Sequence, residues 1–234
     1  MENTQQREKK YNEKKWKKIM DTTQNNYANM LKRLTRKKKL SNFVLIYYSI
    51  FLIINTLTGK YFSSYFNPIF SEYFGIILSV VMLAYSIINS NANYEVRIVN
   101  IESALNKLKT IKRQLCEENL QDCIDRYNKI TDSTERREDV DFYITIKHFC
   151  KEYEINLLTK KHKKEFFDSK NKSREDYNDQ EEAVKNYLSE INVVFEQGKI
   201  FFGYLWPIIL FVIPVLIFVL CVITSSKVGF VKLV

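Results

Sequence analysis

The stretch TRKKKLSNFVLIYYSIFLIINTLTG, residues 35–59, decides the fold of this chain. A block of four basic residues, 36–39, runs directly into a window without any charge, Leu40–Gly59. A helix rises ~1.5 Å per residue, so about 20 residues are needed to cross a hydrocarbon core of about 30 Å. We therefore expect a membrane-spanning helix over residues 41–58.

Two further windows without charge, Tyr73–Tyr94 and Ile200–Ser226, are also long enough to span a membrane. Together the three windows predict a transmembrane hairpin over 41–91 and a third span within 199–226. The connection at 59–75 is rich in Phe and Tyr, which collect at the headgroup level, so it is expected as a short hairpin in the interface. A re-entrant or surface-lying third segment is the alternative, but it would leave a long apolar run without a bilayer to cross.

Outside these windows, apolar residues recur at helical spacing in two segments. The first stripe comprises Trp16, Ile19, Met20, Tyr27, Met30, Leu31 and Leu34. The second, a seam like that of a coiled coil, comprises Ile98, Ile101, Leu105, Leu108, Ile111 and Leu115. The first stripe could lie on a membrane surface or pack on other helices, and packing is favoured because the stripe is narrow and its polar surroundings are dense.

The remaining segments complete an all-α membrane protein. Residues 119–139 are polar and contain a turn at 131–139. Residues 140–167 are expected as a helix. A strand is the alternative there, because the apolar residues Phe142, Ile144 and Ile146 occupy every second position. A linker at 168–180 and an amphipathic helix at 181–197 follow. The predicted parts are a basic helix (1–40), the transmembrane hairpin (41–91), a helical region (92–198), a third transmembrane segment (199–226) and a tail (227–234).

Charge predicts the orientation. Residues 1–40 hold 13 basic and 4 acidic residues, which accounts for the whole net charge of +9. The residues assigned to topology and lipid-headgroup contact are Arg33, Arg36, Lys37, Lys38 and Lys39. The positive-inside rule then places the N-terminus and 92–198 in the cytoplasm of a multi-pass inner-membrane protein. Nucleic-acid binding is the rival reading of the basic arm; the adjoining span and the lack of a nucleic-acid motif disfavour it, so no direct nucleic-acid contact is expected.

Polar residues form a heptad stripe in each of the first two spans. They are Asn42, Ser49 and Thr56 in the first, and Ser79, Ser86 and Asn93 in the second. Seven residues fall about 20° short of two helical turns, so each set shares one helix face. These faces could pack against other helices in lipid or line a weakly polar pore. Because one copy with two or three spans cannot enclose a water path, a pore requires a homo-oligomer.

The sequence offers no catalytic constellation. It has no glycine-rich phosphate loop, no GxSxG and no HExxH, and its four cysteines and two histidines do not stand at metal-ligand spacing. No Asp, Glu, Lys or Arg lies within the predicted spans, which argues against a proton relay. We therefore expect a protein that is not an enzyme and that needs neither a metal nor another cofactor.

Three consecutive segments resemble a known family. A basic helix (YANMLKRLTRKKKLSNF) leads into the two-span hairpin, a charged helix follows (NANYEVRIVNIESALNKLKTIKRQL), and then comes RYNKITDSTERREDVDFY. Over residues 12–165 this order resembles the SLATT family, the SMODS- and SLOG-associating two-transmembrane effectors of bacterial conflict systems. Within that family it is similar to the subgroup encoded beside reverse transcriptases, as in retron-type cassettes.

The resemblance implies an antiviral effector that forms a pore or disrupts the inner membrane when a partner senses infection, which causes growth arrest or cell death. The implied partner is a reverse transcriptase or a nucleotide-signalling enzyme of the same system. The third hydrophobic segment departs from the two-span pattern of the family and leaves open whether the hairpin alone makes the pore. The rival class of function is a membrane anchor or scaffold that does not conduct ions and holds a cytosolic partner.

Overall fold

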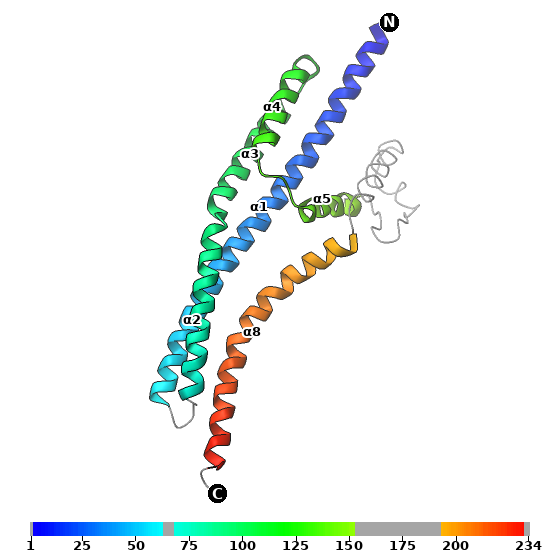
Figure 1. The fold of residues 1–234 in the computed structure, drawn as a ribbon. Helices are drawn as coiled ribbons and strands as arrows, with labels where there is room; N and C mark the ends of the chain where they lie inside the picture. The colour runs from blue at the N-terminus through cyan, green and yellow to red at the C-terminus, as the bar shows by residue number, and fades with distance from the viewer. Residues whose placement is uncertain (1, 63–67, 153–192, 232–234) are drawn as a thin grey trace, which may run out of the picture. The chain divides into compact units, whose positions relative to one another are not determined.

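The computed structural model describes residues 2–62, 68–152 and 193–231, and these ranges are helical almost throughout (Figure 1). The elements in chain order are α1 (Glu2–Tyr61), α2 (Pro68–Asn91), α3 (Tyr94–Gln114), the short 3₁₀ helix η1 (Glu117–Asn119), α4 (Leu120–Ser133), α5 (Asp139–Glu152) and α8 (Val193–Val231). The described ranges contain no strand. The predicted all-α class is therefore confirmed.

Three helical stretches within the described residues are long and apolar enough to cross a membrane. They lie in Asn12–Tyr61, Pro68–Gln114 and Val194–Leu220, and so contain the first two windows without charge and most of the third. The last has the highest mean hydropathy, 2.5, over its apolar window. The chain is an all-α membrane protein.

The chain divides into two compact units. One, here called the charged unit, comprises residues 1–35 and 95–201. The other, here called the membrane unit, comprises residues 36–94 and 202–234 and holds almost all of the three windows without charge. Helices α1 and α8 contribute residues to both units.

In the charged unit, α1 packs on α3 and α4 through the predicted apolar stripes. Met20 is fully buried in a cluster with Ile111, Leu115 and Cys123. Trp16 packs against this cluster and meets the ring of Tyr127 edge to face, with centroids 5.8 Å apart. The residues of the two stripes that are buried are Met20, Tyr27, Met30, Leu34, Ile101, Leu105, Leu108, Ile111 and Leu115. Packing on other helices, the favoured reading of the first stripe, agrees with this burial.

Helix α4 is an element that the sequence analysis did not predict. Residues 119–139 were read as polar with a turn, yet Leu120–Ser133 is helical and only 134–138 connects it to α5. The helix forms because Cys123, Tyr127 and Ile130 recur at three-and-four spacing and reach the core cluster around Met20. Because this apolar stripe is narrow and most residues around it are polar or charged, its helical spacing was not recognised in the sequence.

Helix α5 confirms the prediction of a helix rather than a strand at its described residues, Asp139–Glu152. Phe142 and Ile146, one turn apart, are both buried on its inner face. The remainder of the predicted helix (153–167), the predicted linker (168–180) and the predicted amphipathic helix (181–197) up to residue 192 lie outside the described residues.

The ends of the hairpin helices differ from the prediction. Helix α1 runs unbroken to Tyr61, and α2 already begins at Pro68, so helix covers much of the segment that was expected as an interfacial turn. Proline is favoured in the first turn of a helix because its missing N–H has no helical partner there anyway. At the other end, α3 does not continue directly from α2, because Asn93 adopts a left-handed conformation with φ 47°. Asn tolerates this region better than most residues.

Candidate functional site

The interior of the transmembrane hairpin holds polar side chains that bond α1 to α2. Near one end, Ser41 donates to the side-chain oxygen of Asn89, and Tyr85 donates to Ser41 at 3.0 Å. Near the other end, the Asn55 amide donates to the Ser71 carbonyl at 3.1 Å, while the Ser71 hydroxyl donates to the Asn55 carbonyl at 3.2 Å. These residues lock the two helices together in an environment that offers no water to compete.

An apolar layer fills the hairpin between these two polar contacts. Val44, Tyr48 and Leu78 are buried there. The outward surface is also apolar: Ile46 is 62% exposed and Ile53 60% exposed. Such exposure is unusual for a protein in water and is what a lipid-facing surface requires.

The predicted stripe residues are not those that join the hairpin. Asn42, Ser49, Thr56, Ser79 and Ser86 are all exposed on the membrane unit. The hydroxyls of Ser49, Thr56 and Ser79 each donate to the carbonyl four residues earlier, at 2.7–2.9 Å. They are therefore satisfied by their own helix and need no partner from α1 or α2. Asn93, the sixth predicted residue, is exposed at the break between α2 and α3.

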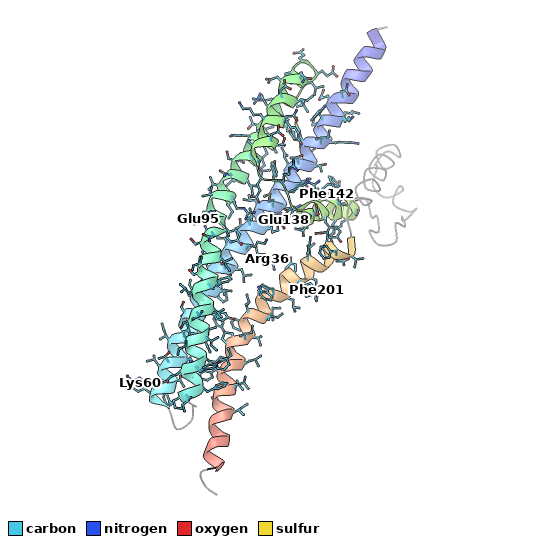
Figure 2. All side chains as sticks on the ribbon, in the orientation of Figure 1. Arg36, Lys60, Glu95, Glu138, Phe142 and Phe201 are labelled. Atoms are coloured by element: carbon cyan, nitrogen blue, oxygen red, sulfur yellow. The ribbon has the colours of Figure 1, made fainter. Side chains whose placement is uncertain are left out.

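Both stripes lie on one face of the hairpin, here called the polar face (Asn42, Ser49, Thr56, Ser79 and Ser86). Thr56 of α1 and Ser79 of α2 line the same open groove, with a volume of about 1040 Å³. Lys60 and Glu72 also line this groove, four residues after Thr56 and seven before Ser79 respectively. Figure 2 shows Lys60 near the end of α1. The polar face itself is uncharged, and one residue of each charge sign adjoins it at this end of the hairpin.

Helix α8 contacts the hairpin on a different side of α1. Tyr47 donates to the Phe211 carbonyl at 3.0 Å, and the two rings stack with centroids 4.9 Å apart. Tyr47 lies two residues before Ser49, which is about 200° around a helix with ~100° per residue. The third helix therefore packs on the side of α1 that points away from the polar face. The polar face stays uncovered in the described part of the membrane unit.

The five residues assigned to topology lie in different environments. Arg33 belongs to the charged unit, where its guanidinium makes two 2.9 Å bonds to the Asp141 carboxylate and one of 2.5 Å to Glu138. Its side chain is only 13% exposed, so its position is set by α5 rather than by headgroups. Burial by itself lowers the pKa of Arg33, but the hydrogen bonds and charge of Asp141 and Glu138 raise it overall, so the guanidinium stays charged.

The other four topology residues belong to the membrane unit. The Arg36 guanidinium lies 4.1 Å from the centre of the Tyr204 ring and donates to the Gly203 carbonyl at 2.8 Å. Lys37 and Lys39 are exposed and Lys38 is half-buried. The exposed lysines fit the headgroup contact that was predicted, whereas Arg36 is engaged with α8.

Sequence reasoning missed a buried polar network between α1 and α5. Asn29 donates to the Thr145 hydroxyl at 3.0 Å and to the Asp141 carbonyl at 3.3 Å. Thr145 in turn donates to Asn26 at 2.8 Å. The Arg33–Asp141 pair adjoins these bonds, and Figure 2 shows Glu138 by the start of α5. The available signal was the group of amide side chains at 24–29, which stand between apolar residues of the first stripe and were not considered with it.

Comparison with known families identifies the chain. Residues 8–220 match the family described as SMODS and SLOG-associating 2TM effector domain family 5. The chain belongs to this SLATT family. The match covers most of the chain and includes the transmembrane hairpin and the described part of the charged unit from residue 8 onward. Comparison with curated proteins and with solved structures gives no match.

The SLATT match agrees with the resemblance seen in the sequence and extends it. It reaches residue 220, so it includes most of α8 as well as the hairpin. At the level of its family, the chain is a membrane effector domain of a conflict system. The family is described by two spans, and the matched residues of this SLATT chain also include most of a third apolar helix, which packs on the hairpin opposite the polar face.

Proposed function

We propose that this SLATT protein is a membrane effector that acts in antiviral defence by letting ions cross the bacterial inner membrane. The observation that carries the proposal is the polar face: five polar residues on one side of the hairpin remain exposed, although other polar residues pack the hairpin and α8 covers another side. In an assembly of several copies, these faces would turn toward a common axis and line a weakly polar path.

The chemistry of the polar face suits passive leakage. Hydroxyls bonded to their own helix can face lipid in the resting state at little cost, and can also contact water in an open state. The polar face holds no carboxylate or amine along the spans, so nothing on it would relay protons or couple transport to charge movement. The action we propose is physical and not enzymatic, and it requires no metal or other cofactor.

Opening of the path requires a trigger that favours the open assembly. A partner can shift this equilibrium only as far as it binds the open arrangement more tightly than the closed one. The partner that we propose is a nucleotide-signalling enzyme or a reverse transcriptase of the same system. From the positive-inside rule we expect the N-terminus and residues 92–198 in the cytoplasm, where such a partner would be found.

Ion leakage from liposomes tests the proposal. Purified wild-type protein should release a trapped ion, and the pair Ser49→Leu and Ser86→Leu should abolish the leak while insertion and assembly persist. The matched control is Thr58→Leu, which changes a hydroxyl residue about 180° around α1 from Ser49 and should leave the leak intact. Leakage that survives the double substitution would remove the polar face from the mechanism. An intact barrier in the wild type, together with tight binding of a cytosolic protein, would favour a scaffold instead.

A further inference from the structure

The third helix contains two prolines that leave backbone carbonyls without helical partners. Helix α8 continues through Pro207 and Pro214. A helical N–H bonds the carbonyl four residues earlier, and proline has no N–H, so the carbonyls of Gly203 and Leu210 lose their partners. In the hydrocarbon region each unsatisfied carbonyl costs several kcal/mol, unless a neighbouring helix supplies a donor.

Helix α1 supplies a donor to each of these two carbonyls. Arg36 donates to the Gly203 carbonyl at 2.8 Å, and Tyr48 donates to the Leu210 carbonyl, also at 2.8 Å. Tyr48 is 5% exposed and lies in the apolar layer of the hairpin, against which Leu210 packs. Two of the three α1 side chains that donate to α8 thus reach the carbonyls that the prolines leave open, and the third, Tyr47, reaches the Phe211 carbonyl.

We propose that Arg36 and Tyr48 form a docking surface on α1 for the proline-bearing helix α8, in which each side chain replaces one missing N–H donor. The surface fixes α8 in one register, because sliding α8 along α1 would separate both donors from both open carbonyls. Undocking would expose the Leu210 carbonyl to lipid and would leave the Gly203 carbonyl without its Arg36 donor, so α8 is an integral third helix of the membrane unit rather than a separate anchor. This inference holds whether or not the protein conducts ions.

The specificity of the pairing is testable in the full-length chain. Tyr47→Cys and Phe211→Cys, at rings 4.9 Å apart, would report docking by disulfide formation in a background whose native cysteines are replaced by Ser. A protease site inserted between residues 168 and 180 would separate α8 from the hairpin unless the disulfide holds them. Tyr48→Phe and Arg36→Met should each shift the docking equilibrium about threefold to twentyfold toward the undocked state, the range of interhelical hydrogen bonds in membranes.

Restoring the backbone donors distinguishes the proposal from general packing. Pro214→Ala gives the Leu210 carbonyl a helical partner in both the docked and the undocked state, so in this background Tyr48→Phe should no longer weaken docking, whereas Arg36→Met should weaken it as before. Pro207→Ala should likewise remove the effect of Arg36→Met and keep that of Tyr48→Phe. Ile213→Ala, next to Pro214 and without an effect on any N–H, should leave both effects unchanged. Effects of Tyr48→Phe and Arg36→Met that stay the same in both proline backgrounds would overturn the assignment of donors to carbonyls.

Discussion

The two units of the chain bury opposite kinds of surface. In the charged unit, Met20 and Leu108 are 0% exposed, and the side chains around them are charged and solvated. In the membrane unit, Ile46 and Ile53 are largely exposed, whereas Ser41, Asn55 and Ser71 are buried. Water expels apolar groups and thereby drives the first arrangement. Lipid has no such preference between apolar groups, so polar contacts and close packing hold the second together.

The units also differ in the polar groups that they bury. The charged unit holds a complete ion pair, Arg33 with Asp141, supported by neutral hydrogen bonds. In the described part of the hairpin, only neutral amides and hydroxyls bond α1 to α2. The desolvation cost of a charge explains the difference, since an ion pair in lipid would have to overcome a larger penalty. Substitutions should therefore have effects that depend on the unit in which they lie.

The largest effect is expected at the buried ion pair. Asp141→Ala leaves the Arg33 guanidinium without its main partner and should lower the free energy of unfolding of the charged unit by about 3–5 kcal/mol. Thermal unfolding of detergent-solubilised protein, followed by circular dichroism, measures the loss. Asp122→Ala is the control, since its pair with Arg126 is exposed at both side chains and should contribute less than about 1 kcal/mol. Equal losses from the two variants would contradict the distinction.

The same truncation of an aliphatic residue should act differently in the two units. Leu108→Ala removes a fully buried side chain and should cost about 2–5 kcal/mol through lost burial and a residual cavity. Ile46→Ala, at a position 62% exposed in the membrane unit, should leave unfolding nearly unchanged. The two variants are compared by unfolding in one detergent. A large loss from Ile46→Ala would show that this surface is covered by protein, for example by another copy of the chain.

Polar contacts inside the hairpin should have a smaller effect. Asn55→Ala removes the amide that donates to the Ser71 carbonyl and should destabilise the hairpin by about 0.6–1.7 kcal/mol, the range measured for hydrogen bonds within membranes. Unfolding by titration with a denaturing detergent can resolve a change of this size. Thr56→Ala, one residue along and exposed, is the control and should be neutral. An unchanged Asn55→Ala protein would mean that packing alone holds α1 to α2.

Cysteine reactivity should report the charged unit without perturbing it. Burial raises the pKa of the Cys150 thiol to about 11, whereas Cys116 is exposed. At pH 8 a maleimide should therefore label Cys116 much faster than Cys150, and unfolding should remove the difference. Folding favours the protonated Cys150 thiol, so its contribution to stability is complete below pH of about 8.5 and is lost as pH rises toward about 11. Equal labelling rates in the native state would contradict the buried position of Cys150.

The sequence predicted the parts of the fold that follow hydrophobic periodicity. The seam that includes Ile101 and Leu108 was predicted because helices in water bury their apolar stripe. The environments of Arg33 and Arg36 were not predicted, because a basic residue before a span reads the same whether it meets a lipid headgroup or another helix. The donors for the open carbonyls of α8 could not be predicted either, since the prolines show only that donors are needed and not which helix supplies them.

For the polar face, heptad spacing predicted which residues share a helix side, but not what covers them. The residues that join the hairpin, among them Ser41 and Asn55, stand next to the stripe in sequence and have the same chemistry. Only the placement of α2 and α8 separates packing residues from exposed ones. Because Ser41 and Asn55 already join α1 to α2, packing within one copy of the chain is disfavoured as the role of the polar face.

Membrane-potential imaging of expressing cells tests the central claim, an ion path along the polar face, most directly. Expression of the wild-type chain should depolarise the inner membrane, and Thr58→Leu should do the same. The variant with Ser49→Leu and Ser86→Leu should reach the membrane in equal amounts and leave the potential intact. Depolarisation by this double variant at the wild-type rate would contradict an ion path along the polar face.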